Sequence, residues 1–400
     1  MGIKVGVCGT GAFARNFIPL FKAHPLVDGV MLCDLDAAKL AERAEQFDIH
    51  DTCPSLDELC QTDVDAIAIF TQNWLHGPQA VQALRSGKHC YSAVPSAITM
   101  EEIADLVKAV EETGQIYMIG ETSYYYPCAI YCRDRHAKGD FGQIVYGEGE
   151  YYHDWDHGLY DVAKWRGGDK WRETGGSPPM YYPTHSVSMI VSVTGAHAER
   201  VSCFGFVDHH EDGVYGPTAN MWGNPFSNQS ALLQMSDGSM MRINEFRRIG
   251  HPGTVGMSLY GTQGSYEEQA NAKAWVTKNR DETEDLSELL APVGVAARPD
   301  GEMAAVTSAD GTHMGCSKVH DVRRLPKEYV GLPNGHLGSH QFLIDDFVMA
   351  CVQCLHPANN VWQAARYLVP GLVAHESAVR GGEVLEVPDF GDGPETGKGE

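Results

Sequence analysis

This 400-residue sequence has too few basic residues to balance its acidic ones. It contains 30 Lys and Arg against 53 Asp and Glu, which gives a formal net charge of −23, and no basic stripe offsets this excess. Nucleic acids and anionic membrane surfaces bind positively charged faces, so neither is an expected partner. Long hydrophobic runs are also absent, because runs such as 66–70 have the length of a strand. We therefore expect no membrane-spanning helix.

The eleven cysteines lack the regular spacing of a disulfide framework or a zinc site. Cys351 and Cys354 form a lone Cys-x-x-Cys pair inside a predicted helix, and a zinc knuckle would need a second pair nearby. The sequence also lacks a charged and apolar leader, because the first strand begins at Ile3. These absences predict reduced thiols, no bound metal and a cytoplasmic protein.

The first strand runs directly into a glycine-rich turn. Gly9 permits a tight turn, and Gly11 lets backbone N–H groups approach a pyrophosphate at the start of the next helix. Asp34 ends the following strand at the spacing of a carboxylate that binds a ribose 2′-hydroxyl. A carboxylate there would repel a 2′-phosphate, so NAD is favoured over NADP. The predicted cofactor contacts are Gly9, Thr10, Gly11, Ala12, Phe13 and Asp34; a glycine turn without a cofactor is the alternative.

Strand and helix patterns alternate as far as residue 122. The strand candidates are 3–7, 30–33, 66–70, 89–91 and 116–119. Such alternation is typical of a parallel sheet, which binds ligands at the carboxyl ends of its strands. We therefore expect an α/β protein whose residues 1–122 form a Rossmann dinucleotide-binding domain. The loops that follow these strands add Asn73, His76 and Pro95 to the predicted cofactor site.

The pattern changes after residue 127 to one that indicates antiparallel strands. The candidates are 144–152, 201–207, and a hairpin of 230–234 and 240–245 around Asp237-Gly238. We expect an α+β domain over 123–390 with an open, mostly antiparallel sheet.

The remaining segments predict how this second domain is completed. Residues 267–335 have the composition of a long polar insertion, and helices are expected near 338–354 and 361–379. Residues 391–400 are predicted to be a disordered tail. Further copies of the chain would cover the open face of the sheet, which predicts a homodimer or homotetramer.

Motifs along nearly the whole chain resemble the Gfo/Idh/MocA oxidoreductases. The Rossmann start is followed by Thr71-Gln72-Asn73-x-x-His76, by Gly87-Lys88-His89, and by an α+β domain with a histidine-bearing helix. In that family the Gly-Lys-His segment usually continues into Glu-Lys-Pro, whose lysine helps to hold the nicotinamide ribose and the substrate hydroxyl. Here 92–95 reads Ser-Ala-Val-Pro. Because Val94 cannot transfer a proton, another group must act as the base.

A second set of motifs resembles the NAD-dependent glycosidases of this superfamily, typified by α-N-acetylgalactosaminidases. They are Gly120-Glu121-Thr122-Ser123-Tyr124, Tyr151-Tyr152-His153-Asp154, Trp171-Arg172, Tyr182-Pro183-Thr184-His185, Gly335-His336-x-Gly338 and Val387-Pro388-Asp389-Phe390. The resemblance implies that Tyr182 and His185 face the nicotinamide. It also implies a sugar pocket lined by Glu121, Tyr124, His153, Arg172 and His336. A further tyrosine of those enzymes has no counterpart, because position 253 is glycine and His251 is the nearest ionisable residue.

Oxidation of a sugar hydroxyl needs a base that titrates near pH 7, and His185 suits this task. A structural histidine at the start of a helix is the alternative for His185, and a buried aromatic is the alternative for Tyr182. If the oxidised carbon is C3 of a pyranoside, the new ketone permits elimination at C1, addition of water and return of the hydride. The net reaction would be hydrolysis with NAD regenerated. A simple sugar dehydrogenase that releases NADH and an inactive NAD-binding sensor are the alternatives.

Two further clusters have competing interpretations. Residues 153–157 contain two histidines and two aspartates, but strand alternation would place them on opposite faces, so a sugar-contacting loop is favoured over a metal site. The aromatic residues Trp155, Tyr160, Trp165, Trp171 and Tyr181 predict either a sugar-stacking lid or packing under a long loop. His336 is favoured over His340 as a pocket residue, with helix capping as the alternative.

Overall fold

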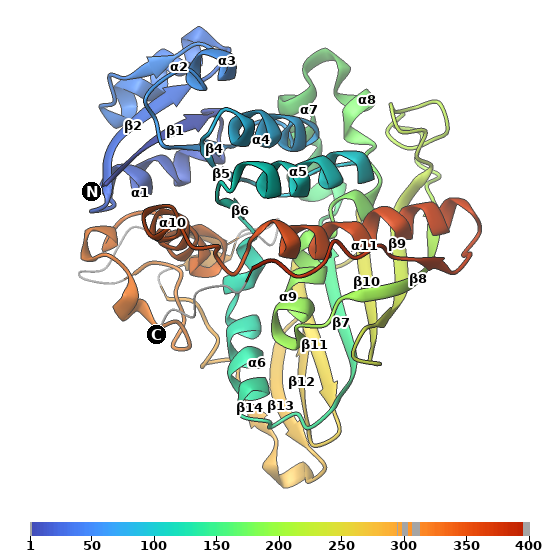
Figure 1. Cartoon of the computed structure of the whole chain (residues 1–400). Helices are drawn as coiled ribbons and strands as arrows, with labels where there is room; N and C mark the ends of the chain where they lie inside the picture. Colours follow the sequence, from blue (N-terminus) through green and yellow to red (C-terminus); the bar gives the residue numbers. More distant parts are fainter. Residues whose placement is uncertain (1, 294, 298–302, 306–312, 395–400) are drawn as a thin grey trace.

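Two large sheets organise the chain (Figure 1). The computed structural model describes residues 2–293, 295–297, 303–305 and 313–394. The first sheet has six parallel strands in the order β3-β2-β1-β4-β5-β6, which confirms the predicted Rossmann sheet. Its strands are β1 Ile3–Cys8, β2 Val27–Cys33, β3 Thr52–Cys53, β4 Ala66–Ile69, β5 His89–Ser92 and β6 Tyr117–Ile119. The helices of this part are α1 Ile18–Ala23, α2 Ala37–Phe47, α3 Leu56–Leu59, α4 His76–Arg85 and α5 Met100–Thr113.

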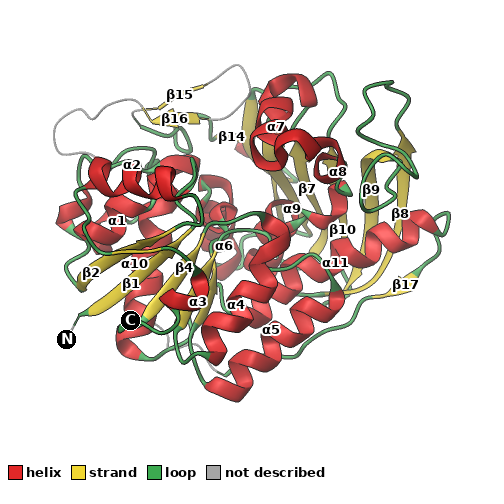
Figure 2. Ribbon diagram, turned by 90° about the horizontal axis from the view of Figure 1, so that it is seen from above, coloured by secondary structure: helices red, strands yellow, loops and turns green. Residues whose placement is uncertain are grey.

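Burial on both faces explains why these segments form a central parallel sheet. Val5 and Val7 of β1 belong to a core shared with α1 and with α10 (Gly335–Gln353). Ile67 and Ile69 of β4 belong to the opposite core, which includes α3, α4 and α5. Figure 2 shows helices on both sides of these strands. Short apolar runs rich in branched residues fit strands that are buried on both faces.

The second sheet has nine strands in the order β14-β13-β12-β11-β7-β10-β9-β8-β17. Within it the pair β7 and β10 is parallel and the other pairs are antiparallel, which confirms the expected open and mostly antiparallel sheet. Its strands are β7 Ile144–Tyr152, β8 Ala198–Val207, β9 Phe226–Met235, β10 Met240–Phe246, β11 Thr254–Gly261, β12 Gly264–Gln269, β13 Ala272–Thr277, β14 Glu284–Asp285 and β17 Leu385–Glu386. A separate two-stranded sheet pairs β15 Val295–Ala297 with β16 Met303–Ala305.

Helices cover one face of the nine-stranded sheet. Helices α6 (Pro127–Ala137) and α9 (Thr184–Thr194) pack against β11 and β7, and α11 (Val361–Val379) packs on β8 and α9 (Figure 1). Between β7 and α9 the chain forms α7 (Tyr160–Gly167) and α8 (Trp171–Gly175). These two short helices and the residues before them form a small separate core around Trp155, Trp171 and Tyr215.

The structure changes the interpretation of residues 267–335. The first part of this polar stretch forms β12, β13 and β14, which extend the sheet beyond β11. Trp275 of β13 is buried and packs edge-on against Phe141, with ring centroids 4.9 Å apart. The polar composition hid these strands because their outward side chains are charged, while a single buried aromatic anchors β13.

Helix α10 returns from the second domain to the parallel sheet. Phe342, Ile344 and Phe347 belong to the same core as β1 and α1. Its helical backbone follows a kink, because residues 336–338 have positive φ angles. Within the predicted tail, Asp392 forms an ion pair with Arg366 at 2.9 Å, and residues 395–400 lie outside the described part.

In the part of the chain that the structure describes, no helix is long and apolar enough to cross a membrane. The eleven cysteines all lie in described segments, and each is a free thiol.

Candidate functional site

A cavity of about 1320 Å³ opens at the carboxyl ends of the parallel strands. Its walls come from the turns after β1, β2, β4 and β5, from β7, from α7 and α9, and from the start of α10. Pockets for one small ligand usually measure about 300–1,000 Å³. This cavity therefore has room for a dinucleotide and a second small molecule.

The glycine-rich turn has the geometry expected of a dinucleotide site. Gly9 has a φ of 87°, and a Cβ there would lie 2.9 Å from the carbonyl carbon of Phe70, so a larger residue does not fit. The Asp34 carboxylate accepts hydrogen bonds from the N–H (2.8 Å) and the hydroxyl (2.9 Å) of Thr10. Gly9, Gly11, Ala12, Phe13 and Asp34 line the cavity, whereas Thr10 is buried behind it. Thr10 therefore positions Asp34.

His76 joins two cavity loops to each other. Its Nδ1 lies 2.8 Å from the carbonyl oxygen of Pro95, and its Nε2 lies 3.1 Å from that of Thr71. Burial lowers the pKa of His76, so the ring is neutral and one nitrogen donates. Asn73 and His76 line the cavity, but Pro95 is not among the lining residues. Val94 lines it instead and presents an apolar surface at the position where the Glu-Lys-Pro segment has its lysine.

The most distinctive part of the site is the pair of His185 and Glu121. Nδ1 of His185 lies 2.6 Å from Oε1 of Glu121, and the backbone N–H and hydroxyl of Ser123 donate to the same oxygen at 2.9 and 2.6 Å. Burial opposes the charge on Glu121, but His185 and Ser123 outweigh it and hold the pKa of Glu121 below its usual value. Burial likewise opposes the charge on His185, yet Glu121 raises the pKa of the imidazole.

These contacts fix the tautomer of His185. Because Glu121 is ionised, Nδ1–H donates to it, and in the neutral imidazole Nε2 carries the lone pair. No described residue forms a hydrogen bond with Nε2, and His185 lines the cavity. His185 is therefore held as a proton acceptor toward the cavity, supported from behind by a fully buried carboxylate.

A second buried carboxylate, Glu245 of β10, lies near the same histidine. Its Oε1 accepts from the Ser186 hydroxyl at 2.6 Å, and its Oε2 accepts from Arg247 at 3.0 Å. Burial raises the pKa of Glu245 to about 7, although Arg247 and Ser186 oppose the shift. The guanidinium of Arg247 in turn lies over the ring of Tyr151, 4.6 Å from its centroid. Arg247 and Tyr151 both line the cavity.

Two tyrosine rings pack against His185. Tyr182 lies 5.4 Å from it and Tyr151 5.4 Å, measured between ring centroids, and the two tyrosines are 5.9 Å apart. The hydroxyl of Tyr151 lies 3.0 Å from Nδ1 of His153. Tyr182 precedes α9, which begins at Thr184, so the two residues meet through the turn and do not share a helical face. Burial raises the pKa of Tyr182, which keeps its phenol protonated.

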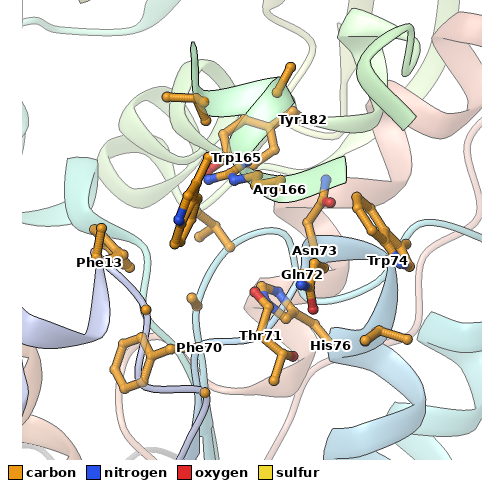
Figure 3. A pocket seen from close by; sticks show the side chains of 18 of the residues that line it. Phe13, Phe70, Thr71, Gln72, Asn73, Trp74, His76, Trp165, Arg166 and Tyr182 are labelled. Atoms are coloured by element: carbon orange, nitrogen blue, oxygen red, sulfur yellow. The ribbon is translucent and has the colours of Figure 1, made fainter. Parts of the chain in front are cut away.

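Helix α7 reaches across the cavity toward the glycine-rich turn. Figure 3 shows Trp165 and Arg166 on the same side as Tyr182, with Phe13 and the Thr71 to Asn73 loop facing them. The Trp165 ring is so close to the turn that a Cβ on Gly11 would lie 3.0 Å from it. Trp165 is nevertheless 57% exposed, so it covers the turn from outside.

The structure brings together most of the predicted sugar-site residues, but not all. His153 and His336 line the cavity, and Glu121 lies one layer behind His185. Tyr124 is not among the lining residues, because its ring packs against the Arg133 guanidinium at 4.1 Å. Arg172 also points elsewhere: it lies over Trp171 and donates to the Asp212 carbonyl oxygen at 2.9 Å. Neither side chain reaches the cavity.

Sequence reasoning missed Arg247 as a lining residue, whereas Trp165 was among the aromatic residues predicted either to form a sugar-stacking lid or to pack under a long loop. One signal was present in β10, where Met241, Ile243 and Glu245 alternate onto the buried face. A glutamate in an apolar register needs a buried partner, and Arg247 supplies it. The aromatic composition of 155–181 left both meanings open for Trp165, because its place depends on how α7 docks.

Residues 153–157 form no metal site in the described structure. The strand ends at Tyr152, and the chain then turns through Trp155–Leu159, where His157 and Gly158 have non-helical backbone angles. Asp154 is used as a cap, accepting from the N–H groups of Asp156 at 2.9 Å and Ile249 at 2.6 Å. No group of three or more metal-ligating side chains occurs among the described residues.

Comparisons with known proteins agree with this geometry. Residues 3–121 match the "Oxidoreductase family, NAD-binding Rossmann fold" and residues 130–267 match the "GFO/IDH/MocA C-terminal domain". A glycosyl hydrolase family 109 protein of Streptomyces niveus is 26% identical over 424 residues, covering 97% of this chain and 77% of that protein. An alpha-N-acetylgalactosaminidase of Bacteroides fragilis is 33% identical over 147 residues, 35% of this chain and 34% of that protein.

Solved structures share the fold at lower identity. Levoglucosan dehydrogenase in complex with NADH and levoglucosan has a TM-score of 0.72 at 16% identity, covering 97% of this chain and 100% of that one. Myo-inositol 2-dehydrogenase of Lactobacillus plantarum has a TM-score of 0.68 at 17% identity, with 97% and 100% coverage. The two-sheet architecture is thus that of known dehydrogenases along almost the whole chain.

Proposed function

This chain belongs to the Gfo/Idh/MocA family of NAD-binding oxidoreductases, and on that basis we propose that it uses NAD to oxidise a ring hydroxyl, at C3, of a sugar or glycoside. The pair of Glu121 and His185 is the observation that carries this proposal, because it holds a proton acceptor toward the cavity. The relation to glycosyl hydrolase family 109 proteins supports a carbohydrate substrate.

The residues at the glycine-rich end of the cavity fit NAD. Gly9 permits close backbone approach, and Asp34 is fixed where a ribose hydroxyl would be recognised. Thr122 lines the cavity, and its buried hydroxyl has no hydrogen-bond partner among the described residues. A buried polar group without a partner is costly, so a ligand hydrogen bond there would be stabilising. The proposed cofactor contacts also include Gly11, Phe13 and Asn73.

His185 is the proposed base of the oxidation. When bound, NAD supplies a hydride acceptor at its nicotinamide ring. Nε2 of His185 takes the hydroxyl proton while the hydride leaves the same carbon, and the Glu121 carboxylate stabilises the resulting imidazolium. Tyr182, whose phenol stays protonated, is proposed to donate a hydrogen bond to the sugar beside His185. His153 is proposed as a further sugar contact.

We extend the proposal to net hydrolysis of a glycoside. A ketone at C3 acidifies the C2 hydrogen, and its removal by a base expels the C1 substituent, which leaves with a proton. Water then adds at C1 of the enone, a proton returns to C2, and hydride returns to C3. One water is consumed, one glycosidic bond is cleaved, and NAD is restored. Because the charge that develops is an enolate, this route needs no pair of glycosidase carboxylates.

The experiment that separates the candidate activities measures two products together. The purified protein is incubated with a panel of aryl glycosides and free sugars, while NADH absorbance and aglycone release are recorded. Aglycone without net NADH supports the redox-neutral glycosidase, and NADH alone supports a sugar dehydrogenase. Measurable NAD affinity with neither product would mean an NAD-binding sensor and would overturn the proposed catalysis.

A single variant tests the role of His185. His185→Ala is expected to abolish turnover while leaving NAD affinity, measured by calorimetry, within about twofold of the wild type. Asp154→Asn is a suitable control, because Asp154 caps a turn outside the proposed catalytic group. Retained turnover in His185→Ala would show that another group acts as the base.

A further inference from the structure

Two histidines at the start of α10 stand beside the glycine-rich turn. His336 and His340 both line the cavity, and both rings meet Phe13 edge-on, with centroids 5.6 and 5.8 Å away. Phe13 follows Gly11 by two residues, so His336 contacts a side chain of the turn whose backbone would hold the cofactor's pyrophosphate, and it lines the same cavity as that turn. The proposed sugar oxidation at His185 assigns no task to either ring.

The backbone that carries His336 adopts a rare conformation. His336, Leu337 and Gly338 have φ angles of 48°, 55° and 89° in succession. Left-handed residues other than glycine are costly, and they persist where surrounding contacts hold them. Such a contact occurs at Gly338, where an added Cβ would lie 2.9 Å from the carbonyl oxygen of Gly315. The turn therefore packs closely against the loop that contains Gly315. This conformation fixes the position of the His336 side chain.

Hydrogen bonds between the rings set their tautomers. The backbone N–H of Gly335 donates to Nδ1 of His340 at 3.3 Å, so the proton of His340 is on Nε2. That Nε2–H lies 2.8 Å from Nδ1 of His336 and donates to it. Because Nδ1 of His336 accepts this bond, Nε2 is the ring nitrogen of His336 that carries a proton. Burial and the adjacent His336 lower the pKa of His340 well below its usual value, so the His340 ring stays neutral.

Packing holds His340 in place for this task. The ring is 1% exposed and lies against Phe17 of the first helical turn, with centroids 4.2 Å apart. A Cβ on Gly335 would lie 2.6 Å from Cε1 of His340, so the chain passes directly over the ring. The contact of His340 with Phe17 therefore joins α10 to the segment that follows the glycine-rich turn.

We propose that His336 is a ligand for the phosphate oxygens of the bound dinucleotide, and that His340 is the positioning residue that keeps its Nε2 a hydrogen-bond donor. This inference rests on the proposed use of NAD and assigns His336 to the cofactor and not to the sugar. The ligand chemistry is a pyrophosphate diester, whose oxygens accept hydrogen bonds. In a chain with a net charge of −23, an N–H donor on the wall of the same cavity as the glycine-rich turn suits an anion.

The test compares two ligands that differ in the pyrophosphate. Affinities for ADP-ribose, which contains it, and for adenosine, which lacks it, are measured by calorimetry. His336→Leu and His336→Gln are a matched pair. Both replace the ring with a flexible side chain at the same left-handed position, but only glutamine has an N–H group that can donate. His336→Leu is expected to weaken ADP-ribose binding about 10- to 100-fold, the usual range for a hydrogen bond to a charged group, and to leave adenosine within about twofold. His336→Gln should recover most of that loss.

His340→Phe tests the positioning role. It keeps an aromatic ring against Phe17 but removes the donor, so ADP-ribose affinity should fall several-fold with adenosine affinity and melting temperature unchanged. Equal loss for both ligands, or no loss of ADP-ribose affinity in His336→Leu, would overturn the phosphate assignment. If the wild-type protein bound neither ADP-ribose nor NAD, the proposed cofactor itself would be wrong, which is a distinct result.

Discussion

At the residue scale, the site is governed by two buried carboxylates on either side of one histidine. Glu121 contacts His185 directly, whereas Glu245 acts from β10 through Ser186 and Arg247. Both are fully buried, yet their charge states differ. Glu121 has a histidine and two donors that keep it ionised, while burial dominates at Glu245. The environment therefore gives two identical side chains different tasks.

Glu121→Gln is expected to shift the pH profile toward acid and to slow turnover. Burial lowers the pKa of His185 and the Glu121 charge raises it, with the charge dominant. The base form of His185 exists above that pKa, so kcat/KM should rise as the pH passes through it. Without the carboxylate the pKa falls, the acid limb moves to lower pH, and kcat drops by about 100-fold because the imidazolium loses its partner. An acid limb at the same pH in wild type and variant would contradict the pairing.

Glu245→Ala is expected to destabilise the fold by about 3–5 kcal/mol, because it leaves the buried Arg247 guanidinium without its carboxylate. Glu245→Gln keeps the hydrogen-bonding shape and should cost less. The raised pKa of Glu245, about 7, means that the folded state favours the protonated acid. Its contribution to stability is complete below the ordinary value of 4.5 and is lost as the pH rises through 7.

Urea unfolding of wild type and Glu245→Gln at pH 5 and pH 8 measures this effect. The wild type should lose more stability between the two values than the glutamine variant does. An equal loss in wild type and variant would show that Glu245 is ionised throughout this range.

At the element scale, α7 and α8 form a small unit with its own core beside the cavity. Trp155, Trp171 and Tyr215 pack together, and Tyr160 and Arg248 both bind Asp212 at the edge of this core. The core of this unit is separate from the cores of the two main sheets, and α7 presents Trp165 and Arg166 to the cavity. The sequence predicted either an aromatic lid or packing under a long loop for this segment. Trp155 and Trp171 follow the second prediction, because both are buried in the small core.

Trp165→Ala is expected to speed the release of NAD at least tenfold with little change in stability. The side chain is 57% exposed, so its removal should alter the free energy of unfolding by less than about 0.5 kcal/mol, while the turn at Gly11 loses its cover. Stopped-flow displacement of NADH measures the rate. Val384→Ala, at a residue 64% exposed and far from the turn, is the control. An unchanged release rate would mean that Trp165 does not retain the cofactor.

At the scale of the whole molecule, the far face of the nine-stranded sheet has no helix over it in the described structure. The strand registers place Phe204, Leu232 and Met240 on this face, and these side chains are 66%, 51% and 50% exposed. Exposed apolar groups gathered on one face are typical of an interface. A second copy of the chain is the occupant that we propose, in a homodimer or homotetramer.

The double variant Leu232→Glu with Met240→Glu is expected to convert such an oligomer into a monomer, because two carboxylates would be buried at the contact. Analytical ultracentrifugation at micromolar concentration measures the mass. Leu355→Glu, at a residue 45% exposed outside the sheet, should leave the mass unchanged. Sedimentation of the wild-type chain as a monomer would contradict the proposed interface.

Much of the fold followed from local patterns. The parallel strands were predicted because their apolar residues are contiguous, and the sheet of the second domain because its residues alternate. The extension through β12 to β14 was missed, since its outward side chains are charged and its buried aromatic residues, Tyr266 and Trp275, do not form a run. Tyr124 and Arg172 were predicted from motif order alone, and that order does not fix where a side chain points.

The sequence by itself determined the nucleotide end of the site, because Gly9 to Phe13 and Asp34 act through backbone conformation and a fixed spacing along neighbouring strands. Tertiary structure alone decided which groups support the base. Glu121 and His185 are 64 residues apart, and Glu245 follows His185 by 60 residues. The three meet because α9 packs on β7 and β10. The contact of α10 with Phe13 likewise arises because an apolar helix face returns to bury itself on the first sheet.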